Sequence, residues 1–208
     1  MKAHSPTSSL ACREAAAWDA KSALLSRLGL PPAGVEAVWS GTCSTGGHRG
    51  GAWFDRGRRY RYLLWRAWGG GGRFVLFILL NPSTADQDRN DPTVERCERR
   101  ARTSGFDGLL VANLFALRST DPGVLREASA PIGPQNDAAL SLAQQLAGQT
   151  ICGWGAHGCT RDRGRILCER LQRPLYHLGL TKDGQPRHPL HLSYSVQPRP
   201  WMQAPNSR

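Results

Sequence analysis

The sequence runs Phe74-Val75-Leu76-Phe77-Ile78-Leu79-Leu80 and continues directly with Asn81-Pro82-Ser83-Thr84-Ala85-Asp86. Seven apolar residues in a row are typical of a strand that is buried on both faces in a parallel sheet. Pro82 ends the strand because it has no N–H to donate to a neighbouring strand, and it keeps Asn81 extended. The stretch therefore predicts polar side chains at the carboxyl end of a central strand, where open α/β sheets bind ligands.

Helix and strand patterns alternate after this first strand. Further buried strands are predicted at 109–113, 150–154 and 175–178. Helices are predicted between them, over 91–105, from 121, over 136–147 and over 161–171. This alternation predicts an α/β fold with a mostly parallel sheet flanked by helices on both faces.

The chain has 208 residues, enough for one domain with a sizeable core. Residues 1–57 are predicted to be an N-terminal appendage, with a helix over 9–28 and a glycine-rich loop over 41–51. Residues 58–196 form the predicted α/β domain. Residues 197–208 contain three prolines and no periodicity, which predicts a frayed tail.

A basic segment with aromatic residues, Arg58-Arg59-Tyr60-Arg61-Tyr62, opens the predicted α/β domain. Such interleaving can form a stacking surface for single-stranded nucleic acid. We favour the other interpretation, a strand with its aromatic side chains in the core and its arginines extending outward along the surface.

The composition is strongly basic, with a formal net charge of +11. Of the 27 basic residues, 24 are arginine, since only Lys2, Lys21 and Lys182 are lysine. Arginine-rich surfaces suit phosphate and nucleic acid, but a GC-rich genome enriches arginine whatever the function. Both explanations remain open at this point.

The six cysteines contain no Cys-x-x-Cys pair and no common metal-ligand spacing, which indicates scattered reduced thiols. No apolar stretch reaches the roughly 20 residues that a membrane-spanning helix needs, and no signal peptide is recognisable. These observations predict a cytoplasmic protein without a membrane partner.

Polar residues follow each of the four predicted strands. Because the carboxyl ends of parallel strands meet at one edge, we expect these residues to surround a small-ligand site. The candidates are Asn81, Ser83, Thr84 and Asp86 after the first strand, Asn113 after the second, Trp154, Gly155 and His157 after the third, and Lys182, Arg187 and His188 after the fourth.

Each candidate also has a structural alternative. Asn81 can satisfy backbone groups in a turn, and Ser83 or Thr84 can cap the following helix. Asp86 can belong to a solvated acidic loop. His188 and His191 have a spacing that suits zinc on a helix, but the prolines around them argue against a helix, so we expect no metal and no cofactor.

Several motifs together resemble a bacterial family catalogued as domain of unknown function family 1643. The resemblance covers roughly residues 58–194, two thirds of the chain, and implies no activity. The motifs are Arg61-Tyr62 with Trp65, Leu80-Asn81-Pro82-Ser83-Thr84-Ala85-Asp86, Asp91-Pro92-Thr93, Asn113-Leu114-Phe115, Thr120-Asp121-Pro122, Gly133-Pro134 with Asn136-Asp137, Trp154-Gly155, Leu178-Gly179-Leu180-Thr181-Lys182-Asp183-Gly184 and Arg187-His188-Pro189-Leu190.

The order of motifs is also similar to that of the uracil-DNA glycosylase superfamily: a buried strand before Asn81-Pro82, a strand ending in Asn113-Leu114, and a final His188-Pro189. This resemblance implies a three-layer sandwich. It also implies that Asn81 or Asp86 orients or activates water, that Asn113 recognises a base, and that His188 stabilises the departing base.

Two hypotheses for the function follow. The first is a metal-independent hydrolase that cleaves an N-glycosidic or similar bond in a nucleobase-containing substrate. The second is a non-catalytic nucleic-acid or nucleotide-binding module, in which Asn81 and His188 are ligands only. Both imply DNA, RNA or a nucleotide as the partner, and neither indicates an oligomeric state.

Overall fold

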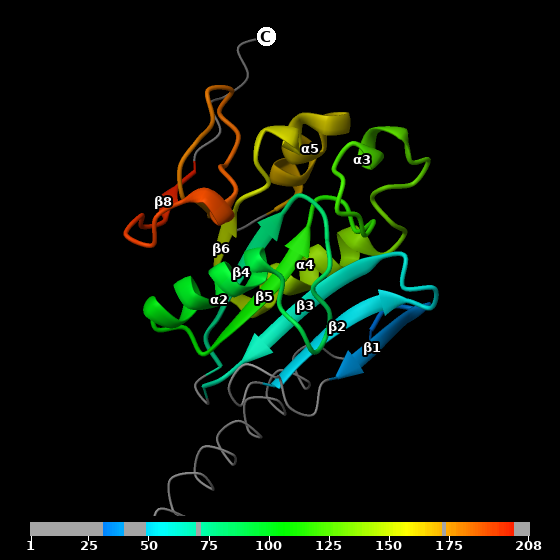
Figure 1. Cartoon of the computed structure of the whole chain (residues 1–208), viewed down its shortest axis with the longest axis horizontal. Coiled ribbons are helices and arrows are strands. Elements are labelled where there is room, and N and C mark those ends of the chain that lie inside the picture. The colour runs from blue at the N-terminus through cyan, green and yellow to red at the C-terminus, as the bar shows by residue number, and fades with distance from the viewer. Residues whose placement is uncertain (1–30, 40–48, 70–71, 172–173, 202–208) are drawn as a thin grey trace, which may run out of the picture.

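A computed structural model describes residues 31–39, 49–69, 72–171 and 174–201. Eight strands form one sheet in the order β1-β2-β3-β5-β4-β6-β7-β8 (Figure 1). The strands are β1 (Val35–Trp39), β2 (Arg49–Asp55), β3 (Arg61–Ala67), β4 (Phe74–Leu79), β5 (Gly108–Asn113), β6 (Ala147–Cys152), β7 (Leu175–His177) and β8 (Arg199–Pro200).

The sheet is mixed, and antiparallel pairings outnumber parallel ones. The pairs β1–β2, β2–β3, β3–β5 and β7–β8 are antiparallel, whereas β4–β5, β4–β6 and β6–β7 are parallel. The prediction of a mostly parallel sheet flanked by helices on both faces, as in a uracil-DNA glycosylase-like three-layer sandwich, is therefore wrong. The helix–strand alternation extends over only part of the chain, and the strands before Phe74 add to the sheet in the antiparallel sense.

The four strands predicted from apolar runs are present as β4, β5, β6 and β7, and they lie parallel in the order β5-β4-β6-β7. Their register is continuous at the centre, where Leu76 pairs with Leu110 on one side and Thr150 on the other. Their carboxyl ends consequently share one edge of the sheet, as the sequence predicts.

Four α-helices are described, and their positions confirm the predicted helical segments. They are α2 (Pro92–Thr103), α3 (Val124–Glu127), α4 (Asn136–Leu146) and α5 (Arg163–Arg170), with short 3₁₀ helices η1 (Ala156–Asp162) and η2 (Pro189–His191). The N-cap of helix α2 is Asp91, whose Oδ1 accepts hydrogen bonds from the backbone N–H groups of Thr93 and Val94. Pro92 suits the first turn because its missing N–H would have no partner there.

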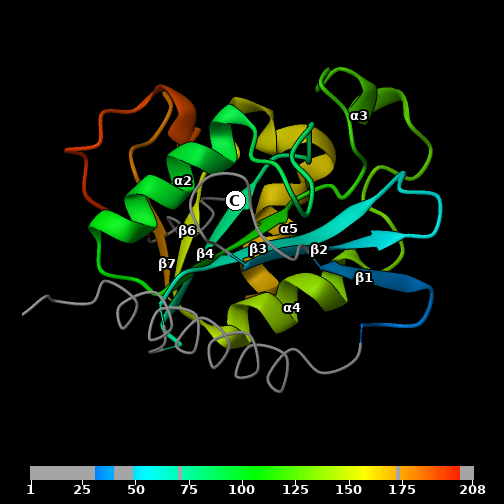
Figure 2. The ribbon, with the colours of Figure 1, turned by 60° about the horizontal axis from the view of Figure 1, so that its bottom comes forward.

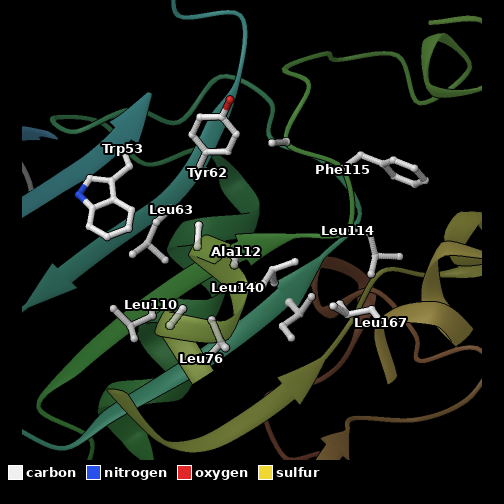
Figure 3. Packing of buried hydrophobic residues seen from close by; sticks show 14 of the residues in the cluster. Trp53, Tyr62, Leu63, Leu76, Leu110, Ala112, Leu114, Phe115, Leu140 and Leu167 are labelled. Carbon is white, nitrogen blue, oxygen red and sulfur yellow. The ribbon is translucent and has the colours of Figure 1, made fainter. Parts of the chain in front are cut away.

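The strands place alternate side chains on opposite faces of the sheet. In β4, Phe74, Leu76 and Ile78 join the cluster that contains α4, whereas Val75, Phe77 and Leu79 join the cluster that contains α2. Figure 2 shows α2 and α4 on opposite sides of the sheet, and Figure 3 shows packing within the α4-side cluster. The continuous apolar run of β4 follows from this burial on both faces.

Strands β1 and β2 belong to the same sheet as the strands of the predicted α/β domain. The expected boundary at residue 57 falls within the β2–β3 connection, and Trp53 and Phe54 are buried in the core. Within the expected tail, Arg199–Pro200 pairs with β7 as β8. The predicted helix over 9–28 lies outside the described residues.

Two arginines of β3 are buried, in contrast to the predicted outward position. Arg61 is 2% exposed and donates to the Ala85 carbonyl at 2.7 Å. Arg66 is fully buried and donates to the Asp86 carbonyl at 2.7 Å and to Asn90 Oδ1 at 2.9 Å. Both guanidinium groups thus fix the loop between β4 and α2, because carbonyls bonded to a cation are strongly held.

No helix in the described part of the chain combines the length and the apolar composition needed to cross a bilayer.

Candidate functional site

A cavity of about 520 Å³ opens at the carboxyl ends of β4, β5 and β6. Its volume lies in the usual range of small-molecule sites, ~300–1,000 Å³. Its polar lining comes from segments far apart in the sequence: Arg61, Asn81, Ser83, Asp91, Thr93, Asn113, Ser119, Thr120, Trp154, His157, His188 and His191.

Asn113, the last residue of β5, is 1% exposed and lines this cavity. Neither its Oδ1 nor its Nδ2 has a hydrogen-bond partner among the described residues. An unpaired buried amide costs free energy, and native proteins satisfy nearly all such groups. The Nδ2 donor and the Oδ1 acceptor of Asn113 lie side by side and are both free, so they can pair with a ligand that has a complementary edge.

The backbone beneath Asn113 is held by two buried side chains. Asn136 Nδ2 donates to the carbonyls of Asn113 and Leu114, at 3.0 Å each. Arg163 Nε donates to the Leu114 carbonyl at 3.0 Å, and its guanidinium is paired with Asp137. The end of β5 is therefore fixed from the α4 and α5 side.

Asn81 presents an oriented carboxamide at the end of β4. Its Nδ2 donates to the Ser119 carbonyl at 2.8 Å and to the Pro82 carbonyl at 3.1 Å. The Ser119 N–H in turn donates to the Pro82 carbonyl at 2.9 Å. Since the amide nitrogen is engaged, Oδ1 is the atom of Asn81 left to accept a hydrogen bond from a ligand or a water molecule.

Asp91 and Arg61 bring opposite charges to the lining. Asp91 caps α2 through Oδ1, while its Oδ2 accepts a long bond of 3.4 Å from the Ala85 N–H. Burial lowers the pKa of Arg61 from 12.5 to about 10, so its guanidinium stays protonated at neutral pH. The lining thus offers one carboxylate and one cation.

His188 enters the cavity from the loop after β7. Gly153, just after β6, allows this loop to approach, because a Cβ there would lie 2.9 Å from Pro189 Cδ. The Leu190 N–H donates to His188 Nδ1 at 3.4 Å, which assigns the proton of the neutral ring to Nε2. His188 therefore offers a neutral N–H donor.

Burial, helped by the neighbouring His191, lowers the pKa of His188 from 6.5 to about 4, against an opposing contribution from Asp91. The unfolded chain binds this proton at a higher pH than the folded protein does. Stability from the neutral ring is thus complete above pH 6.5 and is lost as the pH falls through about 4.

We expect acidification from about pH 7 to about pH 4 to lower the free energy of unfolding by about 2–3 kcal/mol through His188, after allowance for the partial exposure of its ring. Urea unfolding at both pH values measures the change. The variant His188→Asn keeps an acceptor for the Leu190 N–H and should lack this part of the pH dependence. Equal pH dependence in both proteins would contradict the assignment.

The structure brings most of the predicted site residues to one cavity. Asn81, Ser83, Asn113, Trp154, Gly155, His157 and His188 line it. Trp154 is buried, and its Nε1 donates to Gln185 Oε1 at 2.8 Å. Gly155 has a positive φ of 73°, which favours glycine at the turn after β6.

The remaining predicted residues lie outside the lining. Thr84, Lys182 and Arg187 are exposed. Asp86 Oδ1 accepts hydrogen bonds from the backbone N–H groups of Asp88 and Arg89, at 2.9 and 2.8 Å. This carboxylate organises the loop before α2, and the carboxylate in the cavity is that of Asp91.

Six further polar residues line the cavity that were not among the predicted site residues: Arg61, Asp91, Thr93, Ser119, Thr120 and His191. Asp91 stands at the start of the helix predicted over 91–105. Four of them, Arg61, Asp91, Thr93 and Thr120, lie in the motifs quoted above for the family, and this was the available signal.

The two histidines of the final loop are neighbours, with ring centroids 6.4 Å apart. Within residues 31–39, 49–69, 72–171 and 174–201, no group of three or more His, Cys, Asp or Glu side chains is arranged to hold a metal ion.

The family profile of proteins of unknown function DUF1643 matches residues 61–190. The chain belongs to the DUF1643 family. No curated protein and no solved structure matches it. The match begins at Arg61 and ends at Leu190, so both residues that bound the DUF1643 domain also line the cavity.

Proposed function

We propose that the cavity binds a nucleobase and that the protein is a metal-independent hydrolase of the N-glycosidic bond to that base. The observation that carries this proposal is the buried, unpartnered carboxamide of Asn113 in the cavity lining. Nucleobases present adjacent donors and acceptors, and an Asn side chain can pair with such an edge through both its atoms.

The other lining residues fit the steps of such a reaction. Asn81 Oδ1 accepts a hydrogen bond from a water molecule and orients it, and the Asp91 carboxylate takes the proton of that water. The water oxygen bonds to the anomeric carbon as the carbon–nitrogen bond breaks. The electron pair leaves on the base nitrogen, where the His188 Nε2–H stabilises the negative charge.

The protein should be incubated with nucleosides and with oligonucleotides that contain damaged or modified bases. Chromatography then measures the released free base. The proposal predicts release from at least one of these substrates, and loss of release in the variant Asn81→Ala/Asp91→Ala/His188→Ala. Unchanged release by this variant, or no release from any of the substrates, would overturn the hydrolase.

A second candidate, a non-catalytic nucleotide-binding module, is favoured by the contacts of Asp91. Both of its carboxylate oxygens accept backbone hydrogen bonds, as expected for a purely structural cap. In that case the cavity binds a base and releases it unchanged. Saturable binding of a nucleoside without base release distinguishes this candidate from the hydrolase.

A further inference from the structure

The connection between β2 and β3 carries three exposed arginines, Arg56, Arg58 and Arg59. The turn is well defined, because the Arg58 N–H donates to the Asp55 carbonyl at 2.9 Å and the Tyr60 N–H donates to Asp55 Oδ1 at 2.6 Å. The turn therefore holds its cations on a fixed scaffold.

A fourth arginine, Arg118, joins the turn from the segment after β5. Its backbone N–H donates to the Arg59 carbonyl at 3.0 Å, and its Nη1 donates to the Arg58 carbonyl at 3.2 Å. The guanidinium groups of Arg58 and Arg118 lie over the Phe54 ring, at 5.0 and 5.3 Å from its centroid. We call Arg56, Arg58, Arg59 and Arg118 the arginine cluster.

The charge of the arginine cluster is not neutralised by ion pairs within the described residues. Some other surface arginines have carboxylate partners: Arg73 pairs with Asp107, Arg99 with Glu95, and Arg165 with Asp162 and Glu169. The one carboxylate at the base of the turn, Asp55, is bonded to the backbone. The exposed guanidinium groups of Arg56, Arg58 and Arg59 are therefore free to bind an external anion.

The arginine cluster adjoins the cavity through the chain itself. Arg118 precedes Ser119 and Thr120, which line the cavity, and Ser119 holds Asn81. On the other side, Arg59 is followed within two residues by Arg61, which also lines the cavity. The arginine cluster and the cavity are therefore joined by short stretches of chain, residues 59–61 and 118–120.

We propose that the arginine cluster is a docking surface for the phosphate backbone of a nucleic-acid strand. This inference rests on the proposed function for the fate of the base, which would enter the cavity beside Asn113 while neighbouring phosphates lie on the arginines. It makes a polynucleotide, and not a free nucleoside, the natural ligand.

The test measures binding of a fluorescein-labelled oligothymidine of about 12 nucleotides, a usual length for single-strand sites, by anisotropy over a range of salt concentrations. The variant Arg56→Gln/Arg58→Gln/Arg59→Gln removes three charges from the cluster. The control variant Arg73→Gln/Arg99→Gln/Arg165→Gln removes three charges from exposed arginines that have carboxylate partners.

We expect the cluster variant to lower the slope of log K against log salt by about 2, since each phosphate contact to a single strand contributes about 0.7. Its affinity at low salt should fall at least ~10-fold, and that of the control variant by less than ~3-fold. Equal losses in both variants would overturn the proposal, because bulk charge would explain them. Binding of polyglutamate as tight as that of the oligonucleotide would also overturn it, in favour of an acidic protein partner.

The cavity variant Asn113→Leu separates this inference from the proposed function. It should keep the salt slope of the unmodified protein, because the phosphate contacts are intact. If no substrate releases a base but the cluster variant loses slope, the hydrolase fails and the docking surface stands. If bases are released and the salt slope is unchanged in the cluster variant, the docking surface fails and the hydrolase stands.

Discussion

Replacement of Asn113 by leucine is expected to stabilise the protein while it weakens base binding. The unpaired carboxamide of Asn113 is buried, so its removal relieves a desolvation penalty of about 1–2 kcal/mol, and the adjoining cavity has room for the larger side chain. Loss of the paired contact to a base should reduce affinity by about 1–3 kcal/mol, roughly 5- to 150-fold. Urea unfolding measures the first effect, and calorimetric titration with free bases and nucleosides measures the second.

Asn136 is the matched control, because it is also a buried asparagine but its Nδ2 is bonded to the carbonyls of Asn113 and Leu114. We expect Asn136→Leu to destabilise the protein by about 2–3 kcal/mol, since two buried acceptors lose a partner. The opposite signs of the two changes are the signature of a ligand-binding group. Destabilisation of similar size in both variants would show that Asn113 is structural.

Replacement of Asp91 by asparagine should lower base release by about 10²- to 10⁴-fold with little change in stability. Asparagine is as good a helix N-cap as aspartate, so the hydrogen bonds from Thr93 and Val94 persist, but it cannot take a proton from water. Its amide cannot also accept the long bond from the Ala85 N–H, so a loss of stability below about 1 kcal/mol is expected. Asp91→Ala loses the cap as well and should cost about 1–2 kcal/mol of stability. Initial rates and urea unfolding of the same preparations separate the two effects.

Asp86→Asn is the companion variant, because Asp86 precedes α2 in the same loop but does not line the cavity. An asparagine still accepts hydrogen bonds from the N–H groups of Asp88 and Arg89, so activity should change by less than ~3-fold. A large loss of activity in Asp86→Asn together with full activity in Asp91→Asn would show that Asp86, and not Asp91, takes the proton from the water. Full activity in both variants would leave neither carboxylate with a role in the reaction.

The central strands were predictable because their side chains are buried on both faces. β4 and β5 are continuous apolar runs, and this pattern also indicates that they end at the same edge of the sheet. The convergence of Asn81, Asn113 and His188 then followed from the topology alone. No long-range packing detail was needed for that step.

Strand β2, in the antiparallel part of the sheet, was hidden by its composition. β2 contains Gly50 and Gly51 in a segment that resembles a flexible loop. Gly51 is required there because the Trp65 ring of β3 covers it, and a Cβ would lie 2.0 Å from that ring. Such a glycine is explained only by a tryptophan fourteen residues later in the chain, so local propensity cannot reveal the strand.

The charged members of the site were missed for a similar reason. Arg61 can be buried because its Nη1 donates a hydrogen bond to the carbonyl of Ala85, which is distant in the sequence. Asp91 is both a helix cap and a cavity residue, and its sequence context reveals only the first role. The roles of such residues depend on contacts between segments that are far apart in the sequence. A pattern of neighbouring residues does not reveal these contacts.

Asn113 combines a fixed backbone with an amide plane that no neighbour holds. Since neither Oδ1 nor Nδ2 has a partner, the two atoms can exchange places by a half-turn about the last side-chain torsion. Asn81 lacks this freedom, because its Nδ2 is bound to the Ser119 carbonyl. The cavity can thus meet a ligand edge that presents donor before acceptor as well as the reverse order, which would give it tolerance for both amino- and oxo-substituted rings.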